Sequence, residues 1–215
     1  MMMEIERHTE PFTHWIIYDL LTVQMIDEIY SVNPTLTADT NKCRSYFYFT
    51  PDNISSYPHM ESFVNNFIGF KPLLEKYRQT QTTPLPGAEE NFDNAYLRVA
   101  VTVDKFSYYL KRHTDIKEKL LALVIYLNRE ANPNTIGTEL HHLEDLTFDS
   151  VKTIPFRHNV GLMIAPGLDT WHSFTNAAEI KTARRCLMVN IQTPSDDLKR
   201  ISPGHPDLVE SSWKL

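Results

Sequence analysis

Cysteine is scarce in this sequence, which has only Cys43 and Cys186 among its 215 residues. The two lie far apart and do not have the close spacing of zinc ligands. The sequence therefore argues against a disulfide-built scaffold and against a cysteine-based zinc site. So few thiols suit a reducing compartment, and we expect an intracellular, cytoplasmic protein.

An excess of positive charge is also missing. Lysine and arginine number 21 against 27 aspartate and glutamate residues, which gives a formal net charge of -6. No basic stripe is available to neutralise the phosphates of a nucleic acid, so we expect no nucleic-acid partner. The charge favours a small molecule or a peptide as the partner instead.

Long apolar runs and internal repeats are absent as well. No run approaches the roughly 20 residues of a membrane-spanning helix, and residues 1–10 are polar and charged. We therefore expect no membrane association. A chain of 215 residues is long enough to bury a sizeable core, and we predict one domain over residues 1–215. Its oligomeric state does not follow from the sequence.

Residues 1–90 have a mostly helical pattern. Apolar residues recur at helical spacing after Thr22, a favourable N-cap residue, and again around residues 63–70. Pro72 fits the first turn of a third helix. Two short strands interrupt this part of the chain, and they are expected at residues 15–18 and 44–49.

The pattern changes to strands after a polar loop at residues 79–92. Helices first and strands afterwards predict an α+β fold. Its core would be a double-stranded β-helix, or jelly roll, over residues 95–194, with the N-terminal helices packed on the sheet. Residues 195–215 form a C-terminal tail. The expected core strands are residues 96–103, 120–128, 160–165 and 184–192.

The motif His113-Thr114-Asp115 stands between two of these strands. Alternate side chains of an extended strand point the same way, so His113 and Asp115 can present an imidazole and a carboxylate to one point. His172, far downstream, would complete a set of two histidines and one carboxylate. Such a set binds one face of an iron ion and leaves the opposite positions open. We predict a metal site formed by His113, Asp115 and His172.

Other histidines are also followed two residues later by a carboxylate. His205-Pro206-Asp207 lies in the tail, with too little chain after it to supply another strand, and three further pairs end in glutamate: His8/Glu10, His59/Glu61 and His142/Glu144. Strand context favours His113 over all of them. A zinc site at His141, His142, Glu144 and Asp145 is a less simple interpretation than a solvated turn, so we assign no metal there.

Several short segments follow one another in a defined order through residues 95–194. They are His113-Thr114-Asp115 with Lys117; Ile125-Tyr126-Leu127-Asn128; Gly137-Thr138-Glu139-Leu140; Phe156-Arg157-His158-Asn159; Trp171-His172; and Arg184-Arg185-Cys186-Leu187. In order and spacing this part of the chain resembles the 2-oxoglutarate and Fe(II)-dependent oxygenases, particularly the group related to prolyl hydroxylases. It departs from many members at Cys186, where they have serine.

This resemblance implies a double-stranded β-helix with Fe(II) between its sheets. His113, Asp115 and His172 would be the iron ligands, Arg184 would bind the far carboxylate of the cosubstrate 2-oxoglutarate, and the phenol of Tyr126 would hydrogen-bond the same carboxylate. With O2, 2-oxoglutarate would be oxidised to succinate and CO2 while one oxygen atom enters a substrate. An arginine suits its role because it can donate two parallel hydrogen bonds to a carboxylate.

Arg184 and Arg185 are neighbours in an expected strand, so only one of them can point into the barrel. Arg184 shares its face with Cys186, and Arg185 shares the other face with Leu187. The composition of the two faces leaves the choice open. The resemblance favours Arg184, because the small residue two positions on leaves room for the carboxylate.

The expected function is hydroxylation of a peptidyl substrate, with prolyl peptides among the candidates, or of a small molecule. Asp115 favours hydroxylation, or desaturation, over halogenation, because related halogenating enzymes have a small residue at that position. Two alternatives stay open: a non-catalytic jelly-roll binding module, and a cupin-like metal enzyme that does not use 2-oxoglutarate. The intact ligand set counts against the first, and Arg184 counts against the second.

Overall fold

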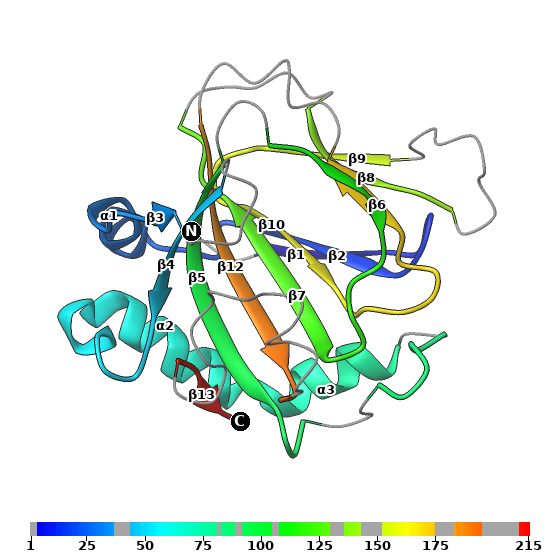
Figure 1. Ribbon diagram of the computed structural model, residues 1–215, viewed down its shortest axis with the longest axis horizontal. Helices are drawn as coiled ribbons and strands as arrows, with labels where there is room; N and C mark the ends of the chain where they lie inside the picture. The colour runs from blue at the N-terminus through cyan, green and yellow to red at the C-terminus, as the bar shows by residue number, and fades with distance from the viewer. Residues whose placement is uncertain are drawn as a thin grey trace.

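The computed structural model describes residues 4–36, 44–80, 83–88, 92–104, 108–129, 136–142, 152–174, 183–194 and 211–215. Within these ranges the chain forms two antiparallel sheets and three α-helices (Figure 1). Some residues named above lie outside the described residues, namely Cys43, Glu144, Asp145 and the segment His205-Pro206-Asp207.

The larger sheet has nine strands among the described residues, in the order β1-β2-β10-β7-β12-β5-β4-β3, with β13 paired to β5. Long strands β5, β12 and β7 lie side by side at its centre (Figure 1). Its members are β1 (Glu4–His8), β2 (His14–Tyr18), β3 (Thr35–Leu36), β4 (Arg44–Phe49), β5 (Tyr96–Asp104), β7 (Lys119–Tyr126), β10 (Val160–Ile164), β12 (Arg184–Gln192) and β13 (Trp213–Lys214).

The smaller sheet has the order β6-β11-β8-β9. Its strands are β6 (Leu110–His113), β8 (Gly137–Leu140), β9 (Lys152–Pro155) and β11 (His172–Phe174). Leu140, Ile154 and Phe174 of this sheet pack in one buried cluster with Tyr126 and Leu162 of the larger sheet. The two sheets therefore face each other across a shared apolar layer.

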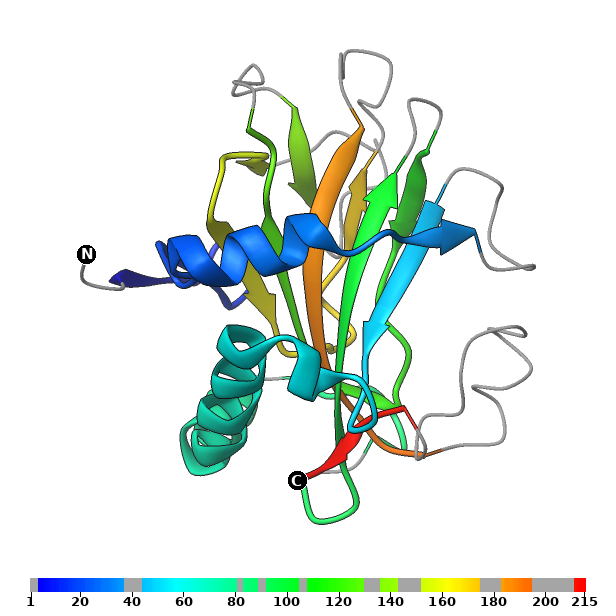
Figure 2. The same cartoon turned by 90° about the vertical axis from the view of Figure 1, so that its left-hand side faces the viewer.

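Helices α1 (Val23–Ser31), α2 (Pro58–Gly69) and α3 (Lys71–Gln79) pack on the other face of the larger sheet, and Figure 2 shows α1 and α2 in front of it. A short 3-10 turn, η1 (Ile54–Ser56), precedes α2. Thr22 caps α1 as predicted, since its hydroxyl accepts a hydrogen bond from the Met25 amide at 3.3 Å. Pro58 and Pro72 lie in the first turns of α2 and α3. No helix in the described ranges combines the length and apolar character of a membrane span.

Side chains alternate along β12 between two buried layers. Leu187 packs with the helices, whereas Cys186 packs between the sheets. Arg185 is on the helix side, where its Nη1 donates to the carbonyl oxygen of Ile29 in α1 at 2.8 Å. Arg184 points the other way, into the space between the sheets. The face predicted for Arg184 is confirmed.

The expected order of helices first and strands afterwards is wrong for the first part of the chain. The strands predicted at residues 15–18 and 44–49 are present as β2 and β4, but both are full members of the larger sheet. Strand β1 also lies in this part. Its residues are mostly exposed because it forms an edge of the sheet. An exposed edge strand needs no apolar alternation, so the sequence pattern does not reveal it.

Gly137 lies where β8 closely approaches β9. A Cβ atom added there would overlap the backbone carbonyl of Ile154 and lie 2.9 Å from Cα of Pro155. We expect Gly137→Ala to lower the free energy of unfolding by about 1 to 3 kcal/mol, as overpacking does. Urea denaturation measures this. Gly69→Ala is the matched control, because nothing lies within 4 Å of the added atom. Equal losses in both variants would contradict the close approach.

Candidate metal centre

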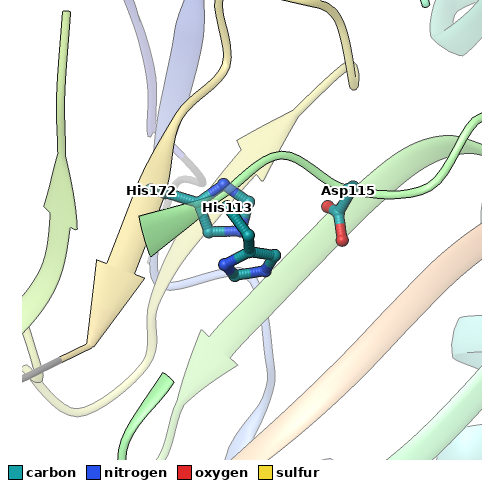
Figure 3. Close-up of side chains that lie close together, drawn as sticks. All are labelled: His113, Asp115 and His172. Carbon is teal, nitrogen blue, oxygen red and sulfur yellow. The ribbon is translucent and has the colours of Figure 1, made fainter. Parts of the chain in front are cut away.

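The three side chains predicted as metal ligands come together in the structure (Figure 3). The ligand atoms of His113, Asp115 and His172 all lie within 4.8 Å of one another. His113 is the last residue of β6, His172 is the first of β11, and the two pair directly across these strands. Their ring centroids are 4.4 Å apart. Strand pairing thus brings residues that are distant in sequence to one point.

Asp115 lies in the loop after β6 rather than in the strand, so the simple strand alternation expected for His113 and Asp115 is wrong in this detail. Its carboxylate nevertheless lies beside the two rings (Figure 3). Lys119, the first residue of β7, donates from Nζ to Oδ1 of Asp115 at 2.5 Å. The sequence does not mark this lysine, because a lysine four residues after an aspartate is more often part of an exposed pair.

Asp115 and His172 are both in the protonation state that binds a metal. Burial would raise the pKa of Asp115, but the charge and hydrogen bond of Lys119, together with His172 and His113, outweigh burial and bring this pKa to about 2. Burial lowers the pKa of His172 to about 4, although the charge of Asp115 opposes the shift. At neutral pH Asp115 is therefore an anion and His172 is neutral, with a lone pair for a metal.

Hydrogen bonds to the backbone decide which nitrogen of each imidazole is free. Nδ1 of His113 lies 2.8 Å from the carbonyl oxygen of Lys111, and Nδ1 of His172 lies 2.9 Å from that of Thr170. A carbonyl oxygen only accepts, so each Nδ1 carries a proton, and in the neutral ring Nε2 is then the atom with the lone pair. Two neutral imidazoles and one carboxylate are the donors of Fe(II) sites with open positions. The residues fit the iron that the sequence predicts.

The ligand set lines a cavity of about 280 Å³. Arg44, Arg184 and Tyr108 line the same cavity. Apolar side chains from both sheets complete much of its wall, among them Leu110, Val124, Leu162, Ile164 and Phe174. The metal group and Arg184 therefore share one cavity between the sheets.

Arg184 is 6% exposed and its position is closely defined. Its Nε donates to Oδ2 of Asp104 at 2.6 Å, and its guanidinium carbon lies 4.8 Å and 4.7 Å from the ring centroids of Phe156 and Phe174. The ion pair and the two rings fix the orientation of the guanidinium. Asp104 is a site residue that the sequence does not mark, because a carboxylate at the end of a strand is usually solvated.

Tyr126 is fully buried and lies beside the cavity rather than among the residues that line it. Its hydroxyl oxygen is 2.7 Å from Oγ1 of Thr138, which does line the cavity. Burial raises the pKa of Tyr126, so the phenol stays neutral. A contact between Tyr126 and the cosubstrate carboxylate remains a prediction. Thr138, the hydrogen-bond partner of Tyr126, already lines the cavity.

His141 does not lie in the solvated turn expected for it. It is 2% exposed, and its Nε2 lies 2.8 Å from Oγ of Ser173. That hydroxyl donates to Oε2 of Glu139 at 2.6 Å, so it accepts from the imidazole. The Nε2 atom of His141 is therefore a donor in a buried network and offers no lone pair there. His142 is exposed, as expected.

Removal of one imidazole tests the metal site. We expect His172→Ala to weaken Fe(II) binding by more than about a hundredfold, because the loss of a ligand should exceed the 10- to 100-fold effect of losing a residue that only supports a ligand. Anaerobic competition with a chromophoric chelator measures the affinity. His142→Ala, on an exposed histidine, should bind Fe(II) like the parent. Equal binding by the two variants would exclude His172 as a ligand.

Solved structures show which fold this arrangement has. A Pseudomonas putida prolyl-4-hydroxylase is similar over 85% of this chain and 93% of its own, with 10% sequence identity and a TM-score of 0.55. The non-heme alpha-ketoglutarate-dependent epimerase SnoN from nogalamycin biosynthesis is similar over 94% of this chain and 90% of its own, with 12% identity and a TM-score of 0.52. No protein-family model and no curated protein matches the sequence.

Both structures come from one superfamily, whose fold is a jelly roll. Two facing antiparallel sheets, as described above, are the main feature of that fold. The chain therefore has the fold of the 2-oxoglutarate and Fe(II)-dependent oxygenases.

Proposed function

We propose that this protein is an Fe(II)- and 2-oxoglutarate-dependent dioxygenase that hydroxylates a peptidyl substrate, with prolyl peptides among the candidates, or a small molecule. One observation carries the proposal: a group of two histidines and one carboxylate shares a cavity with a buried arginine. The fold by itself would not be enough, because one fold serves many functions.

Each of these side chains has a role in the proposal. His113, Asp115 and His172 would hold Fe(II), and Arg184 would bind the far carboxylate of 2-oxoglutarate. Iron bound there supplies the activation of O2, by which 2-oxoglutarate is oxidised to succinate and CO2 and one oxygen atom passes to the substrate. The chain itself orients the ligands: backbone carbonyls fix both imidazoles, and Lys119 donates a hydrogen bond to Asp115 and helps to keep it ionised.

The cavity argues against both alternatives. A binding module without turnover has no need of three potential metal ligands whose ligand atoms lie within 4.8 Å of one another. A metal enzyme that does not use 2-oxoglutarate has no need of Arg184 in the cavity wall. Arg44 and Arg184 both line the cavity and share the carboxylate of Asp104, so these three residues carry one net positive charge, which favours an anionic ligand.

Hydroxylation is the reaction outcome that we propose for this site. The two similar structures are a prolyl hydroxylase and an epimerase, so the fold accommodates more than one outcome. Asp115 would occupy the iron position that a halide needs in halogenation. Hydroxylation, or a desaturation that follows the same hydrogen abstraction, then remains.

Turnover of 2-oxoglutarate tests the proposed function. Protein supplied with Fe(II), O2 and 2-oxoglutarate should release succinate when a suitable substrate is present. A panel of prolyl peptides, free amino acids and other metabolites identifies the substrate class, and mass spectrometry should find a product with one added oxygen atom. His172→Ala is the inactive control. A chlorinated product, or succinate release equal to that of the control across the whole panel, would refute the proposal.

The adjacent arginines provide a second test. Truncating one partner of an enclosed ion pair costs about 2 to 5 kcal/mol, or roughly thirty-fold to several-thousand-fold in affinity. Arg184→Ala should raise the apparent KM for 2-oxoglutarate by a factor in this range and leave Fe(II) binding nearly intact. Arg185→Ala, on the helix side, should have a much smaller effect. The reverse ranking in two equally well folded variants would assign the cosubstrate to Arg185.

A further inference from the structure

A row of three charged residues crosses the larger sheet beside the cavity. Arg44 in β4 pairs in register with Asp104 in β5, and Asp104 pairs in register with Arg184 in β12. Residues directly opposite each other on adjacent strands have side chains on the same face. Arg44, Asp104 and Arg184 are 9%, 1% and 6% exposed. The row is therefore a buried cluster of two cations and one anion.

Asp104 is the shared partner of both arginines. Arg44 donates from Nη2 to Oδ2 at 2.9 Å and from Nε to Oδ1. Arg184 donates from Nε to Oδ2 at 2.6 Å, and its Nη2 also contacts that oxygen. Burial would raise the pKa of Asp104, but the charges of Arg184 and Arg44 outweigh burial and lower it. All three groups are ionised at neutral pH, so the charges of these three described residues sum to one positive charge.

This charge balance changes the role of Arg184. The carboxylate of Asp104 neutralises one guanidinium, so a pair of Arg184 and Asp104 alone would offer a cosubstrate no net positive charge. Arg44 supplies the charge that this pair lacks. Arg44 and Arg184 both line the cavity, whereas Asp104 is not among the residues that line it. The cavity is therefore bordered by the two cations and not by their counterion.

Aromatic rings hold the two guanidinium groups in place. The ring centroid of Tyr108 lies 4.0 Å from the guanidinium carbon of Arg44 and 5.7 Å from that of Arg184. Phe174 lies against Arg184 on the side of the smaller sheet. Asp104 and these rings restrict both arginines, so a bound carboxylate meets donors that are already oriented.

We propose that Arg44 is a second binding residue for the far carboxylate of the cosubstrate and that Asp104 is the positioning residue for both arginines. This inference rests on the proposed function. Its consequence is selectivity: the cavity should prefer a 2-oxo acid with a second carboxylate, because the net positive charge there depends on Arg44. The sequence shows Arg44 only as the start of an expected strand.

Binding of two 2-oxo acids by a set of variants tests the inference. The probes are 2-oxoglutarate and 2-oxobutyrate, which lacks the far carboxylate, titrated anaerobically into Fe(II)-loaded protein by calorimetry. Arg44→Gln should weaken 2-oxoglutarate binding on the order of ten- to a hundredfold, as loss of one charge near a bound anion predicts. It should leave 2-oxobutyrate binding within about threefold of the parent. Arg185→Gln is the control and should change neither.

A double variant separates charge from structural support. In Arg44→Gln/Asp104→Asn the guanidinium of Arg184 has no counterion among the described residues, so the net positive charge returns, while the amide oxygen of the new asparagine can still accept the hydrogen bond that positions Arg184. We expect 2-oxoglutarate affinity to recover to within about tenfold of the parent. A merely structural role of Arg44 would make the double variant worse than the single one. If Arg44→Gln does not fold, Arg44→Lys replaces it, and this variant should keep 2-oxoglutarate affinity within about tenfold.

The outcomes distinguish this inference from the proposed function. If the parent binds 2-oxoglutarate no more tightly than 2-oxobutyrate, the assignment of the cosubstrate itself fails. Two outcomes would overturn only the role of Arg44, provided that the parent prefers 2-oxoglutarate. Either Arg44→Gln binds 2-oxoglutarate as tightly as the parent does, or it binds 2-oxoglutarate and 2-oxobutyrate more weakly by the same factor. Failure of the double variant to recover would overturn the charge argument in the same way, as would a loss in Arg44→Lys as large as that in Arg184→Ala.

Discussion

The alternation of side chains along β12 is the constraint on which the rest of the structure depends. Residues on one face of this strand pack in the core beneath the helices, and residues on its other face line the cavity. A slip of one residue would exchange the two sets, so that Arg184 would lie under the helices and Leu187 in the cavity. Pairing with β5 on one side and β7 on the other prevents such a slip.

The smaller sheet performs a different task, because its short strands carry the two histidines of the candidate metal site. His172 opens β11, and its neighbour Ser173 is bound to His141 and Glu139 in a buried polar network. Glu139 pairs with Ser173 across β8 and β11. A buried network whose members bind one another makes this strand costly to displace. The residue that follows the ligand therefore helps to keep the ligand in place.

Much of the candidate site could be predicted from the sequence, because its residues are recognised from their own type and from the segments next to them. His113, Asp115 and His172 are marked by residue type and by their neighbouring strands, and strand alternation separates Arg184 from Arg185 once the family resemblance selects a face. Asp104, Arg44 and Lys119 could not be predicted in the same way. The roles of Asp104 and Arg44 arise from pairing between strands that are distant in sequence, and a single charged residue at a strand end gives no sign of its partner. Lys119 contacts Asp115 only four residues away, but most such pairs are exposed, so the spacing does not mark it.

In the fold, too, features that depend on adjacent residues could be predicted, and features that depend on distant residues could not. Helix starts at Thr22 and Pro72 depend on a few adjacent residues, and the sequence is enough to place them. The position of β2 between β1 and β10 depends on a partner far along the chain. Apolar alternation shows that a segment is a strand, but it does not show which strands pair.

The direct pairing of His113 with His172 has a consequence for folding as well as for chemistry. The candidate metal ligands come from two distant parts of the chain, and they meet only when β6 and β11 have paired. A metal that binds this group binds the folded chain and not the unfolded one. By mass action it would stabilise the native state by about 2.7 kcal/mol at a free concentration one hundred times its Kd. The ion would then link β6 and β11 of the smaller sheet, none of whose four strands is longer than 4 residues.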